Sequence, residues 1–119
     1  IRGALMYART IKITFKDTMS KDMFVNYTDT KADEQGISSG TLMKFIMSNS
    51  DIVATLILLF PDYDTFKRDD EKLAGPIIQS MRNQELKVEL NQGEIVGDTA
   101  VSSNFLKTLE KEASFYAAK

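Results

Sequence analysis

Four polar side chains have the chemistry to bind a small-molecule substrate: Arg9, Asn26, Tyr27 and Tyr63. Arg9 lies on the apolar face of a predicted strand, where a buried guanidinium needs an anionic partner. A ligand carboxylate could be that partner; alternatively, Arg9 sits at the strand end and reaches solvent. The Tyr27 hydroxyl could orient a phenolic substrate or simply bond a backbone carbonyl. Residue types and spacing identify no catalytic residue.

Five acidic residues lie close together in the middle of the chain: Asp62, Asp64, Asp69, Asp70 and Glu71. A Ca²⁺ loop needs regular ligand spacing and a glycine at its sharp turn, and this segment has neither. Asp62 is explained as a helix N-cap and Asp64 as a favourable charge in the first helical turn. We therefore predict no metal site.

The composition excludes several classes of function. Histidine and cysteine are absent from the 119 residues, which excludes a histidine base, a Ser-His-Asp triad, thiolate nucleophiles and the usual zinc or haem ligands. The net charge of −2 and the lack of a Lys/Arg cluster argue against a nucleic-acid partner. The apolar runs are too short to span a membrane and nothing resembles a signal peptide, so we expect a cytoplasmic protein without a membrane partner.

The first elements of the chain read as a strand followed by a helix. Residues 7–16 alternate between two faces and are rich in β-branched side chains, which predicts a strand. A helix is predicted from a cap near Ser20 to about Asp33, ended by Gln35-Gly36. Its inner side is predicted to carry Met23, Phe24, Tyr27 and Lys31, with Met19 as a hydrophobic staple.

The next two strands form a predicted hairpin. One covers residues 37–47, where Gly40 marks a bulge or a close approach of another backbone. Turn residues follow at 48–51, and 52–60 is an almost unbroken apolar run of strand length. Both strands carry adjacent apolar residues, so both faces of the sheet need cover. Helices can cover only one face, and a second copy of the sheet is the simplest cover for the other.

The second half of the chain predicts helix, strand and helix. Pro61 stops the third strand and Asp62 caps a helix, within which residues 67–72 read as a solvated surface turn. Gly75-Pro76 predicts two short helices or a kink. Alternating Leu86, Val88 and Leu90 form a fourth strand, followed by a bulge or tight turn at 91–93 and an extended piece at 94–97.

A last amphipathic helix is predicted over residues 103–118. Ser102-Ser103 caps it, and its apolar stripe is Leu106, Leu109, Ala113 and Tyr116. It packs either across a dimer boundary or over the open end of a barrel, or else on the helices of its own subunit. Residues 1–119 are expected to form one domain, in which 1–5 are a tail or cloning remnant and 6–98 are the core.

The element order is β-α-β-β-α-β plus a C-terminal helix. This is the ferredoxin-like α+β arrangement, an antiparallel sheet with both helices on one face. Period-two strands argue against the alternative, a helical bundle.

With this order, its strand lengths and the junction Phe60-Pro61-Asp62-Tyr63-Asp64-Thr65-Phe66, the chain resembles the dimeric α+β barrel superfamily. The resemblance covers residues 6–97 and is to the antibiotic biosynthesis monooxygenase-like branch. It implies a homodimer with two sheets packed face to face, and a small pocket between the sheet and helices of each subunit. Relatives commonly carry a histidine in the helix after that junction, at a place that falls near Asp69. Haem-degrading relatives share an Asn, Trp and His set, of which this chain lacks Trp and His.

Two functions of different classes follow from these observations. The resemblance favours a cofactor-independent, monooxygenase-like enzyme acting on a hydrophobic aromatic or quinone-like molecule oriented by Arg9, Asn26 and Tyr27. A substrate that ionises easily would need no histidine base. The missing histidine favours a non-catalytic dimer that binds a small ligand or a partner protein. A cavity lined by Arg9 or Tyr27 would support the enzyme, and a filled core the binder.

Overall fold

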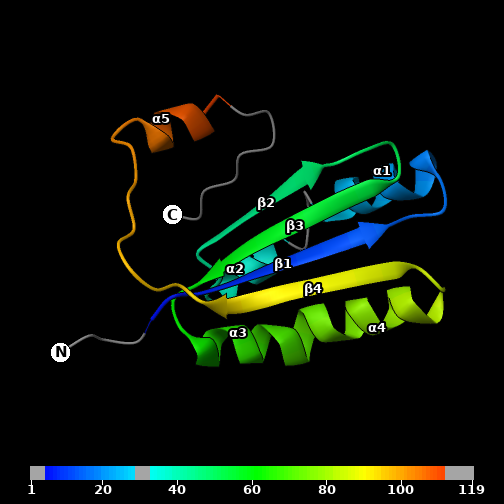
Figure 1. Ribbon diagram of the computed structural model, residues 1–119, viewed down its shortest axis with the longest axis horizontal. Coiled ribbons are helices and arrows are strands. Elements are labelled where there is room, and N and C mark those ends of the chain that lie inside the picture. Colours follow the sequence, from blue (N-terminus) through cyan, green and yellow to red (C-terminus); the bar gives the residue numbers. More distant parts are fainter. Residues whose placement is uncertain (1–4, 29–32, 112–119) are drawn as a thin grey trace.

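The computed structural model describes residues 5–28 and 33–111. Its four strands, β1 (Tyr7–Thr14), β2 (Met43–Ser48), β3 (Val53–Phe60) and β4 (Lys87–Glu94), form one sheet in the order β2-β3-β1-β4 (Figure 1). Every neighbouring pair is antiparallel. This confirms the predicted ferredoxin-like α+β fold, in which the first and third strands are central and the other two form the edges.

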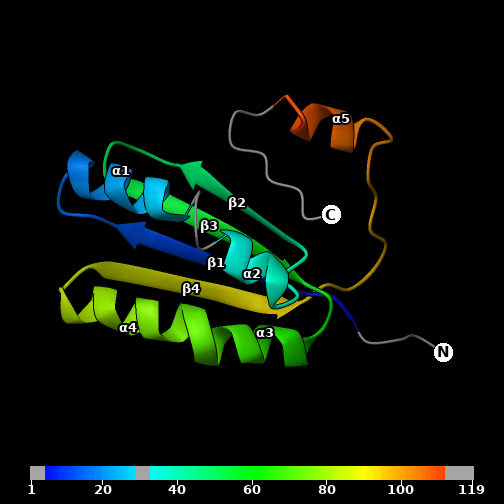
Figure 2. The same ribbon diagram turned by 180° about the vertical axis from the view of Figure 1, so that it is seen from behind.

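The core lies between one face of the sheet and the helices, which Figure 2 shows from the helical side. Alternate residues of β1 and β3 enter this core, among them Ile11, Ile13 and Leu56, and they meet Ile78 and Met81 of helix α4 (Gly75–Asn83). The opposite, open face of the sheet carries the other alternate residues. Phe45 and Met47 of β2 lie on this face and are 45% and 47% exposed. The part of the face that β2 forms is therefore apolar.

Helix α1 (Thr18–Tyr27) begins at Asp17 rather than near Ser20. The Asp17 carboxylate accepts a hydrogen bond from the Ser20 backbone N–H at 2.7 Å, which also lowers the pKa of Asp17. Phe24 packs on the core, 5.4 Å from the ring of Phe15, as predicted. Met19, Met23 and Tyr27 are more than half exposed, so the predicted staple and most of the inner side are wrong. Lys31 lies outside the described residues.

The inner side of α1 is set instead by Lys21, which is buried. Its ammonium donates to the Ser48 hydroxyl and to the Ser50 carbonyl, each at 2.7 Å. These two bonds tie α1 to the β2–β3 turn, while Met23 and Tyr27 face outward.

The predicted strand 37–47 begins late. Gly36 and Ile37 belong to helix α2 (Asp33–Ser38), and β2 starts only at Met43. The Thr41 backbone N–H donates to the Gly36 carbonyl, and Gly40 adopts φ +107°, so this segment is a tight turn. The predicted bulge at Gly40 is therefore wrong. A Cβ at this position would lie 3.1 Å from the side chain of Thr65.

After β3 the chain forms one long helical segment with an irregular centre. Helix α3 (Tyr63–Asp69) is capped as predicted, because the Asp62 carboxylate accepts from the Thr65 backbone N–H at 2.7 Å. A π-helical turn, η2 (Asp70–Ala74), then joins it to α4. The interruption predicted at Gly75-Pro76 is thus a π-turn rather than a break. The predicted surface turn at 67–72 is wrong, because these residues are helical and Asp69 is buried.

Strand β4 pairs with β1 without interruption, from Tyr7 opposite Glu94 to Thr14 opposite Lys87. The bulge or turn predicted at 91–93 is therefore wrong. Beyond β4, helix α5 (Phe105–Leu109) begins at Asn104, two residues after Ser102. In Figures 1 and 2 it stands apart from α3 and α4. The predicted stripe residues Ala113 and Tyr116 lie outside the described residues. None of the helices in the described part of the chain is long and apolar enough to span a bilayer.

Candidate active site

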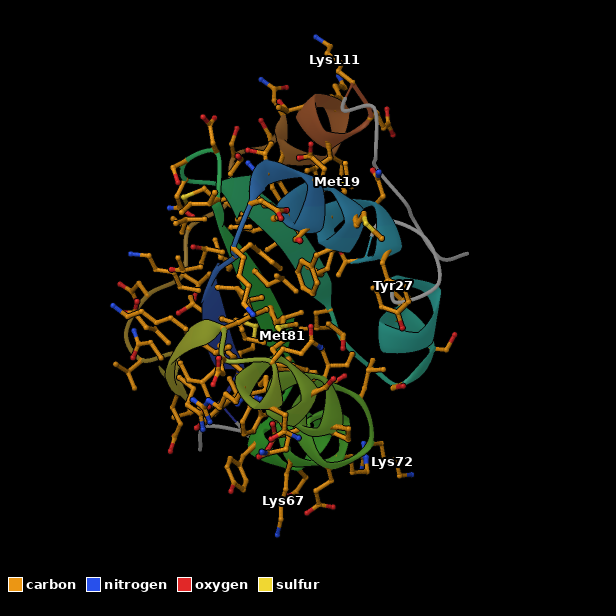
Figure 3. All side chains as sticks on the ribbon, turned by 90° about the vertical axis from the view of Figure 1, so that its right-hand side faces the viewer. Met19, Tyr27, Lys67, Lys72, Met81 and Lys111 are labelled. Carbon is orange, nitrogen blue, oxygen red and sulfur yellow. The ribbon has the colours of Figure 1, made fainter. Side chains whose placement is uncertain are left out.

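A cavity of about 100 Å³ lies between the helical face of the sheet and the helices. Its walls are mostly apolar: the sheet supplies Ile11, Leu56 and Leu58, and the long helical segment supplies Leu73, Ile77 and Met81. Met81 can be seen in Figure 3 between α1 and α4. An apolar cavity of this size suits a small hydrophobic group, such as one aromatic ring.

One carboxyl group, that of Asp69, lines this cavity. Asp69 is 7% exposed, and burial raises its pKa above the ordinary value of 3.8. The Arg9 charge opposes that rise and the Asp70 charge adds to it. Lys44 also lines the cavity, and its ammonium donates to the Thr28 carbonyl at 3.2 Å. The cavity therefore combines apolar walls with a carboxyl that holds its proton more tightly than an exposed aspartate does.

Arg9 lies beside this carboxyl and is itself only 4% exposed. Its Nη1 donates to Asp70 Oδ1 at 2.5 Å, and its guanidinium lies 5.1 Å from the centre of the Phe66 ring. Its Nε is buried and has no hydrogen-bond partner among the described residues. Asp70 is thus an anionic partner of Arg9 within the chain, and the burial of Arg9 contradicts the prediction that it reaches solvent. Contact with a ligand carboxylate stays a prediction.

The helical segment explains why the neighbouring residues Asp69 and Asp70 have different surroundings. Successive residues of a helix point about 100° apart, so Asp69 can face the cavity while Asp70 faces Arg9. The π-turn begins at Asp70, whose carbonyl accepts the Gly75 N–H five residues on. A Cβ at Gly75 would lie 2.4 Å from that carbonyl oxygen, which no real side chain tolerates. Glycine is therefore what allows the turn to close. π-turns of this kind often accompany functional sites.

The structure does not bring the four predicted binding residues together at the cavity. Asn26 is exposed on α1. Tyr27 lines a separate, more open groove between α1 and α4, of about 440 Å³, together with Met23. Tyr63 is half exposed and packs edge-on against Tyr7, with ring centres 5.3 Å apart. Neither Arg9 nor Tyr27 lines this cavity, and Arg9 acts on it only through its charge on Asp69.

The sequence prediction missed Asp69, although a signal was present. Asp69 follows Phe66 by three residues and precedes Leu73 by four, which places all three on one side of a helix. Figure 3 shows Lys67 and Lys72 on the outer side of the same segment. Among the residues that the structure describes, no group of three or more acidic side chains could hold a metal ion.

No protein-family model matches the sequence, and neither does any curated protein. Solved structures do match. A dimeric ferredoxin-like protein from an uncultured marine organism is 10% identical with a TM-score of 0.62, over 82% of this chain and 94% of that one. A Streptomyces coelicolor monooxygenase, ActVA-Orf6, solved with nanaomycin D, is 8% identical with a TM-score of 0.61 over the same shares. The chain thus shares its fold with a dimeric ferredoxin-like protein and with monooxygenases, and this is the fold that the resemblance to the antibiotic biosynthesis monooxygenase-like proteins implies.

A third protein of this fold, the cofactor-independent oxygenase SnoaB from Streptomyces nogalater, is 13% identical with a TM-score of 0.56. The match covers 98% of SnoaB and 82% of this chain. At such identities the likeness concerns the fold alone. The resemblance leads us to expect a histidine near Asp69, and Asp69 itself carries a buried carboxyl.

Proposed function

We propose that the protein is a homodimeric, cofactor-independent oxygenase whose cavity binds a hydrophobic aromatic or quinone-like molecule. In this proposal Asp69 is the general base. The observation that carries it is a buried carboxyl with a raised pKa on the wall of an otherwise apolar cavity. A general base works best when its pKa is close to the working pH, and burial moves Asp69 in that direction.

The proposed reaction uses dioxygen as the oxidant. The Asp69 carboxylate takes a proton from an activated CH₂ group beside an aromatic ring or carbonyl, and the resulting carbanion reacts with O₂. One oxygen atom becomes the carbonyl oxygen of the product, while the other leaves as water with the two hydrogens of the CH₂ group. The substrate loses four electrons and O₂ gains them, so the electrons balance without another reductant.

The homodimer is supported by the open face of the sheet. Phe45, Met47 and Leu59 alternate with the core residues and point to that face, which no helix covers among the described residues. Exposed apolar patches of this kind mark interaction surfaces. The marine protein of the same fold is described as dimeric. Packing two such faces together would bury both.

The first prediction tests the base. Replacing Asp69 by Asn keeps the side-chain shape and removes its ability to take a proton, so turnover should fall by about 10²- to 10⁴-fold. The measurement is oxygen uptake with a panel of aromatic compounds that carry an activated CH₂ group. Asp64→Asn, at an exposed position of α3, is the matched control and should keep full activity. An Asp69→Asn protein that consumes oxygen at the native rate would refute the role of Asp69.

The absent histidine keeps a second function open, that of a dimer which binds a hydrophobic ligand without reaction. Both functions predict that a ligand raises the melting temperature, since binding to the native state alone stabilises it. Only the oxygenase predicts oxygen uptake with that same ligand. A clear thermal shift with no oxygen uptake and no change in the recovered ligand would favour the binding protein.

A further inference from the structure

Arg9 is paired with Asp70 and also acts through its charge on the neighbouring Asp69. Its Nη1 is bonded to Asp70, which is about one-third exposed, whereas Asp69 is almost fully buried. A buried cation is expected to pair with the most desolvated anion beside it, because that attraction is the least screened. The observed pairing is with the more exposed carboxylate, and it leaves the buried one to the cavity.

We propose that Asp70 is a positioning residue for Asp69: it holds the Arg9 guanidinium on its own carboxylate and so prevents that cation from pairing with the carboxyl in the cavity. The inference rests on the proposed role of Asp69 as a base. A base fixed in a salt bridge would be a poor proton acceptor, because its charged form would be stabilised.

Two contacts hold this arrangement. The Phe66 ring supports the guanidinium from one side, 5.1 Å from its centre. The π-turn fixes Asp70 through the bond between its carbonyl and the Gly75 N–H. The Arg9 Nε has no partner among the described residues, so part of the donor capacity of this guanidinium is unused. If Asp70 lost its charge, that capacity could turn to Asp69.

Among the described residues, charged groups near Asp69 or on the wall of its cavity come from three elements. Arg9 comes from β1, Lys44 lines the same cavity from β2, and Asp70 is the next residue of the helical segment. The described residues that line the cavity from α1 and α2 carry no charge: Phe24, Thr28, Gly36 and Ile37. The balance between Arg9 and Asp70 therefore governs how readily Asp69 ionises, together with burial.

Removing the charge of Arg9 and removing the charge of Asp70 should consequently shift the pKa of Asp69 in opposite directions. Asp70→Asn removes a neighbouring negative charge and frees Arg9, and each of these effects lowers the pKa of Asp69. Arg9→Met removes a positive charge, which raises the pKa of Asp69. A purely structural role would give the same kind of change in both variants, since both break the same salt bridge.

The experiment is a ¹³C NMR titration of the Asp69 side-chain carboxyl in the ligand-free protein, assigned with Asp69→Asn. We expect the midpoint to move to lower pH in Asp70→Asn, to higher pH in Arg9→Met, and back towards the native value in Asp70→Glu. Asp64→Asn, an exposed carboxylate of the same helix, should leave it unchanged. With an active substrate, the acid limb of the pH–rate profile should follow the same shifts.

An unchanged or raised midpoint in Asp70→Asn would overturn the proposal, as would shifts of the same sign in the two ion-pair variants. If Arg9→Met does not fold, Asp70→Asn and its rescue by Asp70→Glu still decide the question. The titration needs no turnover. Midpoints that move as expected in a protein without oxygenase activity would refute the reaction but leave the positioning role intact.

Discussion

Asp69 illustrates how a single residue can be placed for chemistry at a cost to the fold. Its pKa in the folded protein is raised above the ordinary value of 3.8 because burial disfavours the carboxylate. The folded state therefore binds a proton more readily than the unfolded state does. Above the pKa of Asp69 in the folded state, the ionised, buried carboxylate lowers the free energy of unfolding. This destabilisation disappears as the pH falls towards the ordinary pKa.

Asp69→Asn should for this reason raise the melting temperature at pH 7 by roughly a few degrees, while abolishing turnover. The gain should shrink as the pH falls through the ordinary pKa of 3.8, below which both states carry a protonated carboxyl. Thermal unfolding of the two proteins across this pH range measures it. A variant that is less stable than the native protein at pH 7 would show that Asp69 is a structural residue.

At the same scale, the sequence predicted where Arg9 lies but not what it meets. Alternation along the first strand correctly placed Arg9 on the buried face. Its partner Asp70 lies in the helical segment beyond the third strand, and only the packing of that segment against the sheet brings the two together. The many charged residues around Asp69 favour a surface turn. The spacing of Phe66, Asp69 and Leu73 nevertheless places them on one side of a helix.

Among the elements, the strands were predictable and the irregular turns were not. Period-two alternation predicted β1, and an almost unbroken apolar run of strand length predicted β3. The segment before β2 is polar apart from Ile37 and Leu42, so no hydrophobic period separates a strand from a helix there. Its conformation is decided by hydrogen bonds of Gly36 and by the positive φ of Gly40. Lys21 takes the inner side of α1 through its buried hydrogen bonds, whereas Met23 and Tyr27 face outward. A hydrophobic pattern does not predict such hydrogen bonds.

The π-turn leads to a prediction whose sign is unusual. Glycine to alanine in a helix normally stabilises it, by up to about 1 kcal/mol. Gly75→Ala should instead destabilise the protein by about 1–3 kcal/mol, because its Cβ would press on the Asp70 carbonyl oxygen. Urea unfolding gives the value. Gly36→Ala, where the nearest atom is at 3.6 Å, is the helical control and should be neutral or stabilising. Stabilisation by Gly75→Ala would mean that the turn is not held by this glycine.

At the scale of the whole molecule, the two faces of β2 and β3 have different surroundings. Phe45 points to the open face and is largely exposed in the single chain, whereas Leu58 lines the cavity. Phe45→Asp should therefore dissociate a dimer and leave a folded monomer. Leu58→Asp should unfold the chain, since it buries an unpaired charge. Analytical ultracentrifugation and circular dichroism separate the two outcomes. A native protein that sediments as a monomer at micromolar concentration would refute the homodimer.

The segment after β4 raises a related question, because Val96, Val101 and Leu106 are each more than 60% exposed. A five-residue helix such as α5 is not stable alone in water and needs packing. We infer that this segment packs on the second subunit. Truncation after Thr99 should then weaken the dimer, measured as a higher dissociation constant by sedimentation. A truncated protein with native dimer affinity and melting temperature would show that the segment is an appendage.

The sheet order also determines how the chain must assemble. β1 is the first strand to be synthesised, yet it is central, and its second neighbour is the last strand, with Tyr7 opposite Glu94. Contacts between such distant parts of a chain close large loops and make folding slow. Until β4 arrives, β1 has an unpaired edge that other chains could join. Nascent molecules are therefore most prone to aggregate just before synthesis of the fold is complete.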